Sequence, residues 1–442
     1  MERYFHAVRL DVDKCKGCTN CIKRCPTEAI RVREGKALII EERCIDCGEC
    51  IRICPNHAKT AFADSLSQRD EFVYNIALPA PSLFGQFRQL VSPEQVLSAL
   101  LGMGFDAVYE VPLAADYVTH AVRDYIAEHG SGPWISSSCP AVVRLIQVRY
   151  PELIKYLIPV ESPMEVAAYL ARRQAAEQMG LAPDRIGVWF ITPCPAKITA
   201  IHQPEGMRSS NANGAFAIKD IYGELLKLMS SEQHAQTGFH ASGLGLGWGR
   251  AGGENVAVAV DNHLAVDGVH SLISLFDEME MGKLKDICFL ECQACVGGCV
   301  GGALTVENPF VARVRLRKLA ESLHTEMHSL RDDYGELEDV GVLTLRGPIE
   351  ARPIMPLAPD MLMAIQKMEQ LEQIDEALPG LDCGACGSPN CRALAEDMVR
   401  GIASETDCVI KLRERVRDLA SEMLDLAQKL PPTMGQNPPK EE

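Results

Sequence analysis

Eighteen of the 442 residues are cysteine, and most of them stand in groups whose spacing suits metal binding. One pattern, C-x2-C-x2-C-x3-C-P, occurs twice, with the second copy 29 residues after the first. Three thiolates on a tight loop can occupy three corners of a [4Fe–4S] cube, while the fourth turns toward another cluster. Zinc sites rarely repeat this spacing before a proline. The pattern predicts two clusters, held by Cys15, Cys18, Cys21 and Cys54 and by Cys44, Cys47, Cys50 and Cys25.

A second group of cysteines lies near the end of the chain with the spacing C-x2-C-x4-C-x16-C. Glycines follow its first two members and let the backbone wrap closely around a cluster, with N–H groups aimed at the sulfurs. A helix over 391–404 would carry the chain to the last cysteine. The group predicts a further [4Fe–4S] cluster on Cys383, Cys386, Cys391 and Cys408, with a structural zinc knuckle as the alternative.

The middle of the chain alternates between short apolar runs and helical stretches, which is typical of an α/β domain with buried, largely parallel sheets. Strands are predicted at 72–78, 106–111, 134–138, 185–192, 256–260 and 287–291. Helices are predicted at 94–102, 115–128, 140–149, 164–179, 217–229 and 269–281. The glycine-rich segment 243–249 lacks the spacing of a nucleotide-binding loop, and we expect an irregular loop there.

Three of the predicted strands run into cysteine motifs, and ligands in such folds bind beyond the carboxyl ends of strands. We therefore expect four thiolates to meet in one crevice and to hold a fourth [4Fe–4S] cluster, from Cys139, Cys194, Cys295 and Cys299. The glycines at 297–298 and 301–302 are expected to clear space for something bulky beside the last ligands. Lys197, three residues after Cys194, needs an anionic partner if it is buried.

Three segments that contain these motifs resemble known protein families. Residues 8–60 resemble the bacterial two-cluster ferredoxin, and the last group of cysteines resembles a small iron–sulfur domain of electron-transfer proteins. Residues 70–305 resemble the catalytic domain of the [FeFe]-hydrogenases. That resemblance implies a diiron site with CO, cyanide and a bridging dithiolate, joined to the cubane through Cys299. It also implies that Lys197 pairs with one cyanide and that Ser82, in the segment Ala80-Pro81-Ser82, contacts cyanide.

The sequence departs from the fast members of that family where protons are handled. Ser138 stands where those enzymes have a proton-relay cysteine, and a serine hydroxyl ionises far less readily than a thiol. Residues 111–127 contain no glutamate, which leaves Asp116, His120 and Asp124 as the obvious substitutes. Thr192 and Gln293 replace the usual methionines. These departures, together with the terminal four-cysteine module, resemble the sensory branch of the family.

The overall composition narrows the class of protein. The net charge of −16 disfavours nucleic-acid binding, because such binding draws on clustered Lys and Arg. We expect a cytoplasmic chain with no membrane span, because no apolar run is long enough to cross a bilayer. The predicted parts are a ferredoxin-like domain at 1–63 (α+β), an α/β hydrogenase-like domain at 64–345, a linker at 346–375, a small, mostly helical iron–sulfur domain at 376–408, an amphipathic helix at 409–430 and a disordered tail at 431–442.

The remaining features leave alternatives open. Apolar residues recur in the tail helix at steps of 3 and 4 from Val409 to Leu430, which is the stripe of a short coiled coil. This helix would form a homodimer, bind a partner, or pack back on the iron–sulfur domain. Cys288 reads as a buried hydrophobic residue. Cys292 reads as a packing residue or as one with a redox or proton role.

Three functions are compatible with these features. The favoured one is reversible heterolytic H2 cleavage with low turnover, in which electrons pass through four [4Fe–4S] clusters to a ferredoxin or signalling partner that senses H2 or redox state. The second is a ferredoxin-coupled or multi-subunit catalytic hydrogenase. The third is an iron–sulfur protein that has no diiron site.

Overall fold

The computed structural model describes residues 4–88, 91–130, 132–229, 238–335, 340–352 and 357–429, so the predicted tail at 431–442 lies outside the described residues. The chain divides into two compact units. The larger unit comprises Met1–Cys15 and Glu41–Ile354, and the smaller comprises Lys16–Ile40 and Met355–Glu442. No helix among the described residues is long and apolar enough to cross a membrane.

A parallel four-stranded sheet with the order β6-β5-β8-β9 lies in the larger unit. Its central strand β8 is apolar on both faces, because Val188 and Phe190 pack on one side and Trp189 and Ile191 on the other. Helices α4 and α6 contribute to the first of these cores, and α3 and α8 to the second. The bounds are β5 (Tyr74–Pro79), β6 (Ala107–Val108), β8 (Ile186–Thr192), β9 (Gly214–Ala217), α3 (Pro93–Gly102), α4 (Val111–His129), α6 (Pro163–Met179) and α8 (Ile218–Met229).

A second parallel sheet, β10-β11-β7, lies in the same unit. Its middle strand packs Leu290 and Cys292 against α5 and α11, through residues such as Leu145 and Phe276. The bounds are β7 (Trp134–Ile135), β10 (His263–Asp267), β11 (Phe289–Gln293), α5 (Pro140–Arg149), α7 (Pro195–His202), α11 (Val269–Glu280), α12 (Pro309–Glu321) and α13 (Leu330–Tyr334). Two parallel sheets with helices on their faces confirm the predicted α/β class.

Two predicted elements are wrong, and both lie in the segment after residue 240. The expected strand at 256–260 is instead occupied by helix α10 (Gly253–Val258), and the expected loop at 243–249 by helix α9 (Gly243–Gly247). The Ser242 hydroxyl caps α9 by accepting from the Gly245 N–H. Glycine is needed here for close packing, because a Cβ on Gly253 would lie 1.8 Å from the Gly247 carbonyl oxygen. Strands β9 and β10 are absent from the predicted set.

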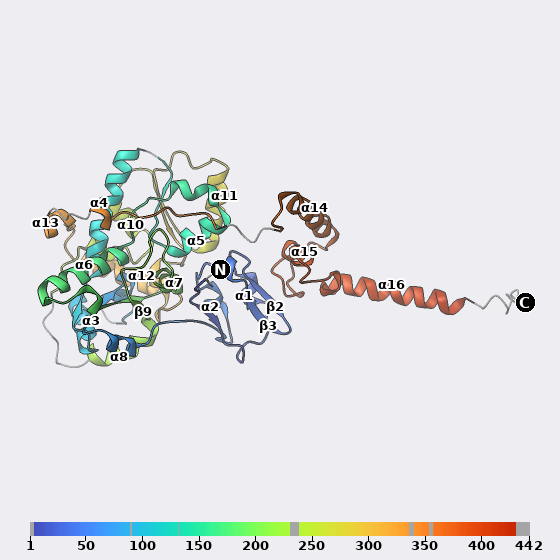
Figure 1. Ribbon diagram of the computed structural model, residues 1–442, viewed down its shortest axis with the longest axis horizontal. Helices are drawn as coiled ribbons and strands as arrows, with labels where there is room; N and C mark the ends of the chain where they lie inside the picture. Colours follow the sequence, from blue (N-terminus) through green and yellow to red (C-terminus); the bar gives the residue numbers. More distant parts are fainter. Residues whose placement is uncertain are drawn as a thin grey trace, which may run out of the picture. The chain divides into compact units, whose positions relative to one another are not determined.

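The ferredoxin-like segment contributes to both units. In the larger unit β1 (Val8–Leu10) pairs antiparallel with β4 (Lys59–Ala61), and α2 spans Glu49–Ile53. In the smaller unit α1 (Asn20–Lys23) precedes the hairpin of β2 (Ile30–Arg33) and β3 (Lys36–Ile39). There α14 (Met361–Ala377) packs on α15 (Cys391–Val399), and α16 (Val409–Gln428) extends from them as one long helix with no buried residue (Figure 1).

Candidate active site

Four cysteines from separate loops come together in the larger unit. Cys139 follows β7, Cys194 follows β8, and Cys295 and Cys299 follow β11, so all four stand beyond the carboxyl ends of parallel strands. Cys139 and Cys194 are the N-cap residues of α5 and α7. Each is followed by a proline at the first helical position, where the missing N–H costs nothing. The N-termini of these two helices favour negative charge on the two sulfurs.

The ionisation of these thiols shows what they are suited to bind. Burial, and after it the neighbouring thiols of Cys295 and Cys139, raises the pKa of Cys194 to about 12. Burial also raises the pKa of Cys139 and, by more, that of Cys299. A bound metal reverses this preference, because it deprotonates a coordinating thiol outright. Four converging thiols in an apolar setting therefore fit a soft-metal group such as a cubane.

A cavity of about 90 Å³ adjoins three of these cysteines. Since one water needs roughly 15 Å³, the cavity has room for a group of several atoms. The Ser82 hydroxyl in its wall is fully buried and has no hydrogen-bond partner among the described residues, an arrangement that is costly unless a ligand completes it. Lys197 lies in the same wall. The residues thus fit a compact anionic group beside the cubane: Cys299 would hold it, Lys197 would neutralise it and Ser82 would donate to it.

The glycines near Cys299 do a different job from the one predicted. They were expected to clear space for the bulky group, but a Cβ on Gly302 would lie 2.2 Å from the Pro193 carbonyl oxygen. A Cβ on Gly298 would lie 2.3 Å from the Gln293 side chain, and one on Gly301 would lie 2.1 Å from the Val296 oxygen. All three neighbours are protein atoms. These glycines instead allow the Cys299 loop to pack tightly on the loops that carry Cys194 and Cys295.

Ser138 lies in the wall shared by the main cavity and a second cavity. Lys197 and Met164 lie in the same shared wall. The second cavity is lined by the buried carboxylates of Glu161 and Glu165. Burial, reinforced by Glu165, raises the pKa of Glu161 to about 7. The predicted relay position is therefore next to a carboxyl group that exchanges protons near neutral pH.

A pair of buried glutamates was missed in the sequence. Glu254, on α10, lines the main cavity, is hydrogen-bonded by Ser136, and has one carboxylate oxygen without a partner among the described residues. Burial and then the neighbouring Glu291 raise the pKa of Glu254 well above its usual range. Burial also raises the pKa of Glu291, which accepts backbone N–H groups at 2.8 Å from Gly252 and Asn255. The adjacency of Glu291 to Cys292 in the active-site motif was the available signal.

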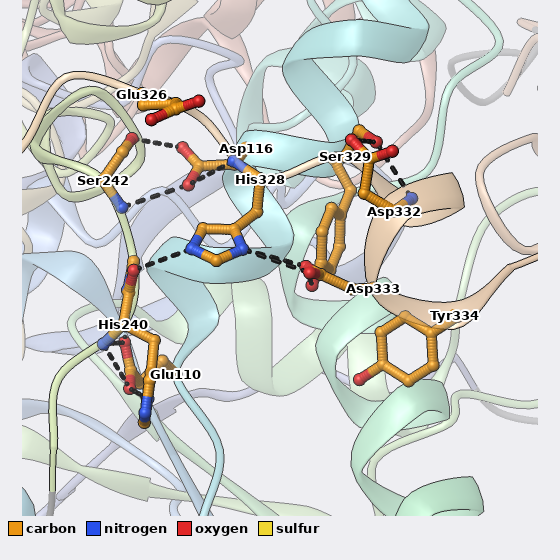
Figure 2. A network of polar contacts seen from close by, with 12 residues as sticks. Glu110, Asp116, His240, Ser242, Glu326, His328, Ser329, Asp332, Asp333 and Tyr334 are labelled. Atoms are coloured by element: carbon orange, nitrogen blue, oxygen red, sulfur yellow. Dashed lines mark hydrogen bonds and ion pairs between the residues drawn. The ribbon is translucent and has the colours of Figure 1, made fainter.

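The acids proposed as substitutes on α4 lie elsewhere. Asp116 accepts from the Ser242 hydroxyl at 2.6 Å and from the Ser242 N–H at 3.1 Å, and Figure 2 shows it within a polar network that includes His328 and Asp333. In that network His328 pairs with Asp333 at 3.0 Å. The Tyr117 hydroxyl on α4 also donates to Asp333 on α13 at 2.6 Å, which ties the two helices together. Asp116 therefore fastens loops together. Neither it nor His120 nor Asp124 is among the described residues that line the cavity.

Of the other residues that the sequence analysis named near the site, some line the cavity and others support the loops around it. Thr192 is fully buried, and its hydroxyl bonds the backbone of Cys194, so it shapes the ligand turn. Gln293 lines the cavity, with its side-chain oxygen unpartnered among the described residues. Cys292 is buried and also lines the cavity, next to Glu254, whereas Cys288 is only partly buried, at the edge of the core.

Among the remaining cysteines, the terminal group fits a set of cluster ligands within the smaller unit. In the smaller unit Cys383, Cys386, Cys391 and Cys408 line one cavity. In the two ferredoxin repeats a backbone N–H reaches a cysteine sulfur at equivalent positions, Ala29 to Cys25 at 3.2 Å and Ala58 to Cys54 at 3.3 Å. Such N–H···S contacts are among the features that tune iron–sulfur clusters.

Three comparisons with known proteins bear on this site. Residues 73–238 match the family described as the C-terminal domain of the iron-only hydrogenase large subunit. Residues 7–55 match a 4Fe-4S dicluster domain, and residues 378–410 match an iron–sulfur cluster family. The chain is [FeFe]-hydrogenase-like. Together the matches support hydrogenase-like, ferredoxin-like and iron–sulfur domains in the chain.

Individual relatives agree with this result at low identity. The periplasmic [Fe] hydrogenase large subunit of Nitratidesulfovibrio vulgaris is 27% identical over 366 residues, which cover 67% of this chain and 86% of the relative. Iron hydrogenase 1 of Clostridium pasteurianum is 26% identical over 280 residues, 52% of this chain and 48% of that protein. A solved [FeFe]-hydrogenase structure from work on stepwise H-cluster assembly has a TM-score of 0.50 at 16% identity, covering 64% of this chain and 95% of the other. This last likeness concerns the fold alone.

Proposed function

We propose that the protein cleaves H2 heterolytically and reversibly at a diiron H-cluster, with low turnover, and that it passes the electrons on as an H2 or redox signal. One observation carries the proposal: the buried Ser82 hydroxyl, which has no partner among the described residues, and Lys197 share a cavity wall with three of the cysteines that would hold the cubane. The diiron group would supply the H2-binding and redox chemistry. Cys299 would bridge it to the cubane, and Lys197 and Ser82 would bind its cyanides.

Protons would be handled by buried carboxyl groups. Ser138 is a weak acid, so its hydroxyl would orient a proton transfer and would seldom hold the charge. Glu254 lines the same cavity, and its burial, followed by the neighbouring Glu291, raises its pKa well above the usual range, which favours the neutral acid. Glu291 lies close to Arg250 and Arg313, and the latter is exposed. The side chains thus form a sequence from the cavity through Glu254 and Glu291 toward the surface.

The low turnover in this proposal rests on Ser138, whereas the buried acids favour the second candidate, a conventional catalytic hydrogenase coupled to ferredoxin or to other subunits. The two candidates differ in H2 evolution from a reduced dye. A sensor gives a low rate together with clear H2-dependent redox changes of its clusters. A catalytic hydrogenase gives a high rate in the same assay. The electron acceptor in either case would be a ferredoxin-like or signalling protein in a reducing compartment.

Infrared spectra of protein made with the maturation machinery test the proposal directly. We expect CO and cyanide bands that shift between H2 and an oxidant. If these bands are absent and the chain holds about sixteen irons, the content of four cubanes, the proposal is wrong. That result would support the third candidate, an iron–sulfur protein without a diiron site. About eighteen irons and the bands together would support the H-cluster.

A further inference from the structure

The second ferredoxin motif carries an arginine that reaches a ligand of the active-site cubane. Arg52 lies on α2, between the predicted cluster ligands Cys50 and Cys54. Its Nη2 donates a hydrogen bond to the Cys295 sulfur at 2.9 Å. Its Nη1 donates to the Glu49 carboxylate at 2.6 Å, which fixes the direction of the guanidinium. One side chain therefore joins the second ferredoxin motif to a predicted ligand of the active-site cubane.

The surrounding packing holds α2 in this position. Gly48, just before α2, has φ +79°, and a Cβ there would lie 2.5 Å from the Ala303 side chain. The same Cβ would lie 3.5 Å from Pro195, the residue after Cys194. Ile45 and Cys47 belong to the same hydrophobic core as Ala196 and Cys292. The contact between Arg52 and Cys295 thus lies inside a rigid part of the larger unit.

The first ferredoxin motif has a cation at the equivalent position. Lys23 is 29 residues before Arg52, which is the spacing of the repeat. In the smaller unit its Nζ donates to the Asp382 carbonyl oxygen and, at 2.7 Å, to that of Pro389. Those carbonyls belong to the loop of the terminal cysteine group. The same repeat position therefore contacts a different cluster loop in each unit.

We propose that Arg52 is a positioning residue that sets the reduction potential of the active-site cubane; this rests on the proposed function. A cubane becomes more negative when it accepts an electron. A guanidinium that donates to one of its thiolates stabilises that reduced form more than the oxidised form, because hydrogen bonds to the sulfurs and nearby charge set cluster potentials. The cation makes the cubane a better acceptor for an electron from the neighbouring ferredoxin cluster.

The experiment measures the cubane potential in the full-length chain loaded only with iron–sulfur clusters, by electron paramagnetic resonance during an anaerobic redox titration. We expect Arg52→Met to lower the potential so that the ratio of reduced to oxidised cubane falls at least about tenfold at fixed potential, or about 59 mV. Arg52→Lys, which keeps the charge, should recover part of the shift. Lys23→Met is the matched control, and it should leave the cubane unchanged.

Two results would overturn the inference: an unshifted cubane in Arg52→Met with wild-type iron content, or an equal shift in Lys23→Met. If Arg52→Met loses iron, Arg52→Gln is measured instead, since it keeps a neutral donor at the same place. A cubane potential below that of wild type supports the inference, and an unshifted potential overturns it. Because the diiron group is not needed for this titration, the outcome is independent of the infrared test. Missing CO and cyanide bands would refute the proposed function and leave the Arg52 measurement standing.

Discussion

Replacing Asp397 with asparagine should lower the free energy of local unfolding of the smaller unit by several kcal/mol. Asp397 is 1% exposed and accepts from Arg31 Nε and Arg33 Nη2, both at 2.7 Å, and from the Ser388 hydroxyl at 2.9 Å. These contacts fasten the ferredoxin hairpin to α15. The asparagine keeps the size but leaves the buried Arg31 guanidinium without its counter-charge. Removing one partner of a buried ion pair costs about 3–5 kcal/mol.

Hydrogen exchange followed by mass spectrometry measures this change locally, on the amides of β2 and α15. Since every 1.4 kcal/mol is a factor of ten, exchange should accelerate roughly 100- to 4,000-fold. Asp375→Asn is the matched control, because Asp375 forms a more exposed pair with Arg392 at 3.6 Å. Such pairs contribute about 0–1 kcal/mol. If Asp397→Asn accelerates exchange no more than Asp375→Asn does, the reasoning about this buried pair is wrong.

Three further predictions concern the site and the terminal helix. Glu254→Gln should lower H2 turnover by about 10²- to 10⁴-fold while the CO and cyanide bands persist, whereas the exposed Glu224→Gln should not; equal rates would exclude Glu254 from the proton route. The native protein raises the pKa of Glu161 from 4.5 to about 7 and so binds more protons than the unfolded chain between these values. Stability therefore falls as pH rises through this window, and above pH 7 Glu161→Gln should gain up to about 3 kcal/mol over wild type in urea unfolding, but nothing below pH 4.5. Leu419, in the apolar stripe of α16, is 42% exposed, and Leu419→Asp should convert a homodimer to a monomer in light scattering while Ser421→Asp should not; equal masses for both variants would count against the dimer.

The cysteine groups could be predicted from sequence because their chemistry is local. Spacing within one loop decides which thiolates can share a cube, and a proline after the cysteine begins the next helix. Strands β5, β6 and β8 of the first sheet could also be predicted, and β8 most clearly, because it is apolar on both faces and bounded by turn residues. The convergence of Cys139 and Cys299 then follows from a general property of parallel sheets, whose strand ends meet at one edge. Cys194 follows a strand of the other sheet, and only the fold brings it to them.

The errors arise where tertiary contacts decide. The valines at 256, 258 and 260 alternate like a strand, yet Val256 and Val258 lie in α10, whose backbone packs directly on α9. Such close contact between helices cannot be read from hydrophobic alternation. The buried pair of Glu254 and Glu291 was missed for a related reason. Glutamates are seldom buried, and only the fold shows that Glu254 lies in the cavity wall close to Glu291.

The ferredoxin-like segment appears as one domain in sequence, but its two halves belong to different compact units. The half with Lys23 contacts the terminal cysteine loop, and the half with Arg52 contacts the active-site cubane ligand. The two halves carry the same cysteine motif with a cation at the same position, so they differ in which cysteine loop that cation contacts.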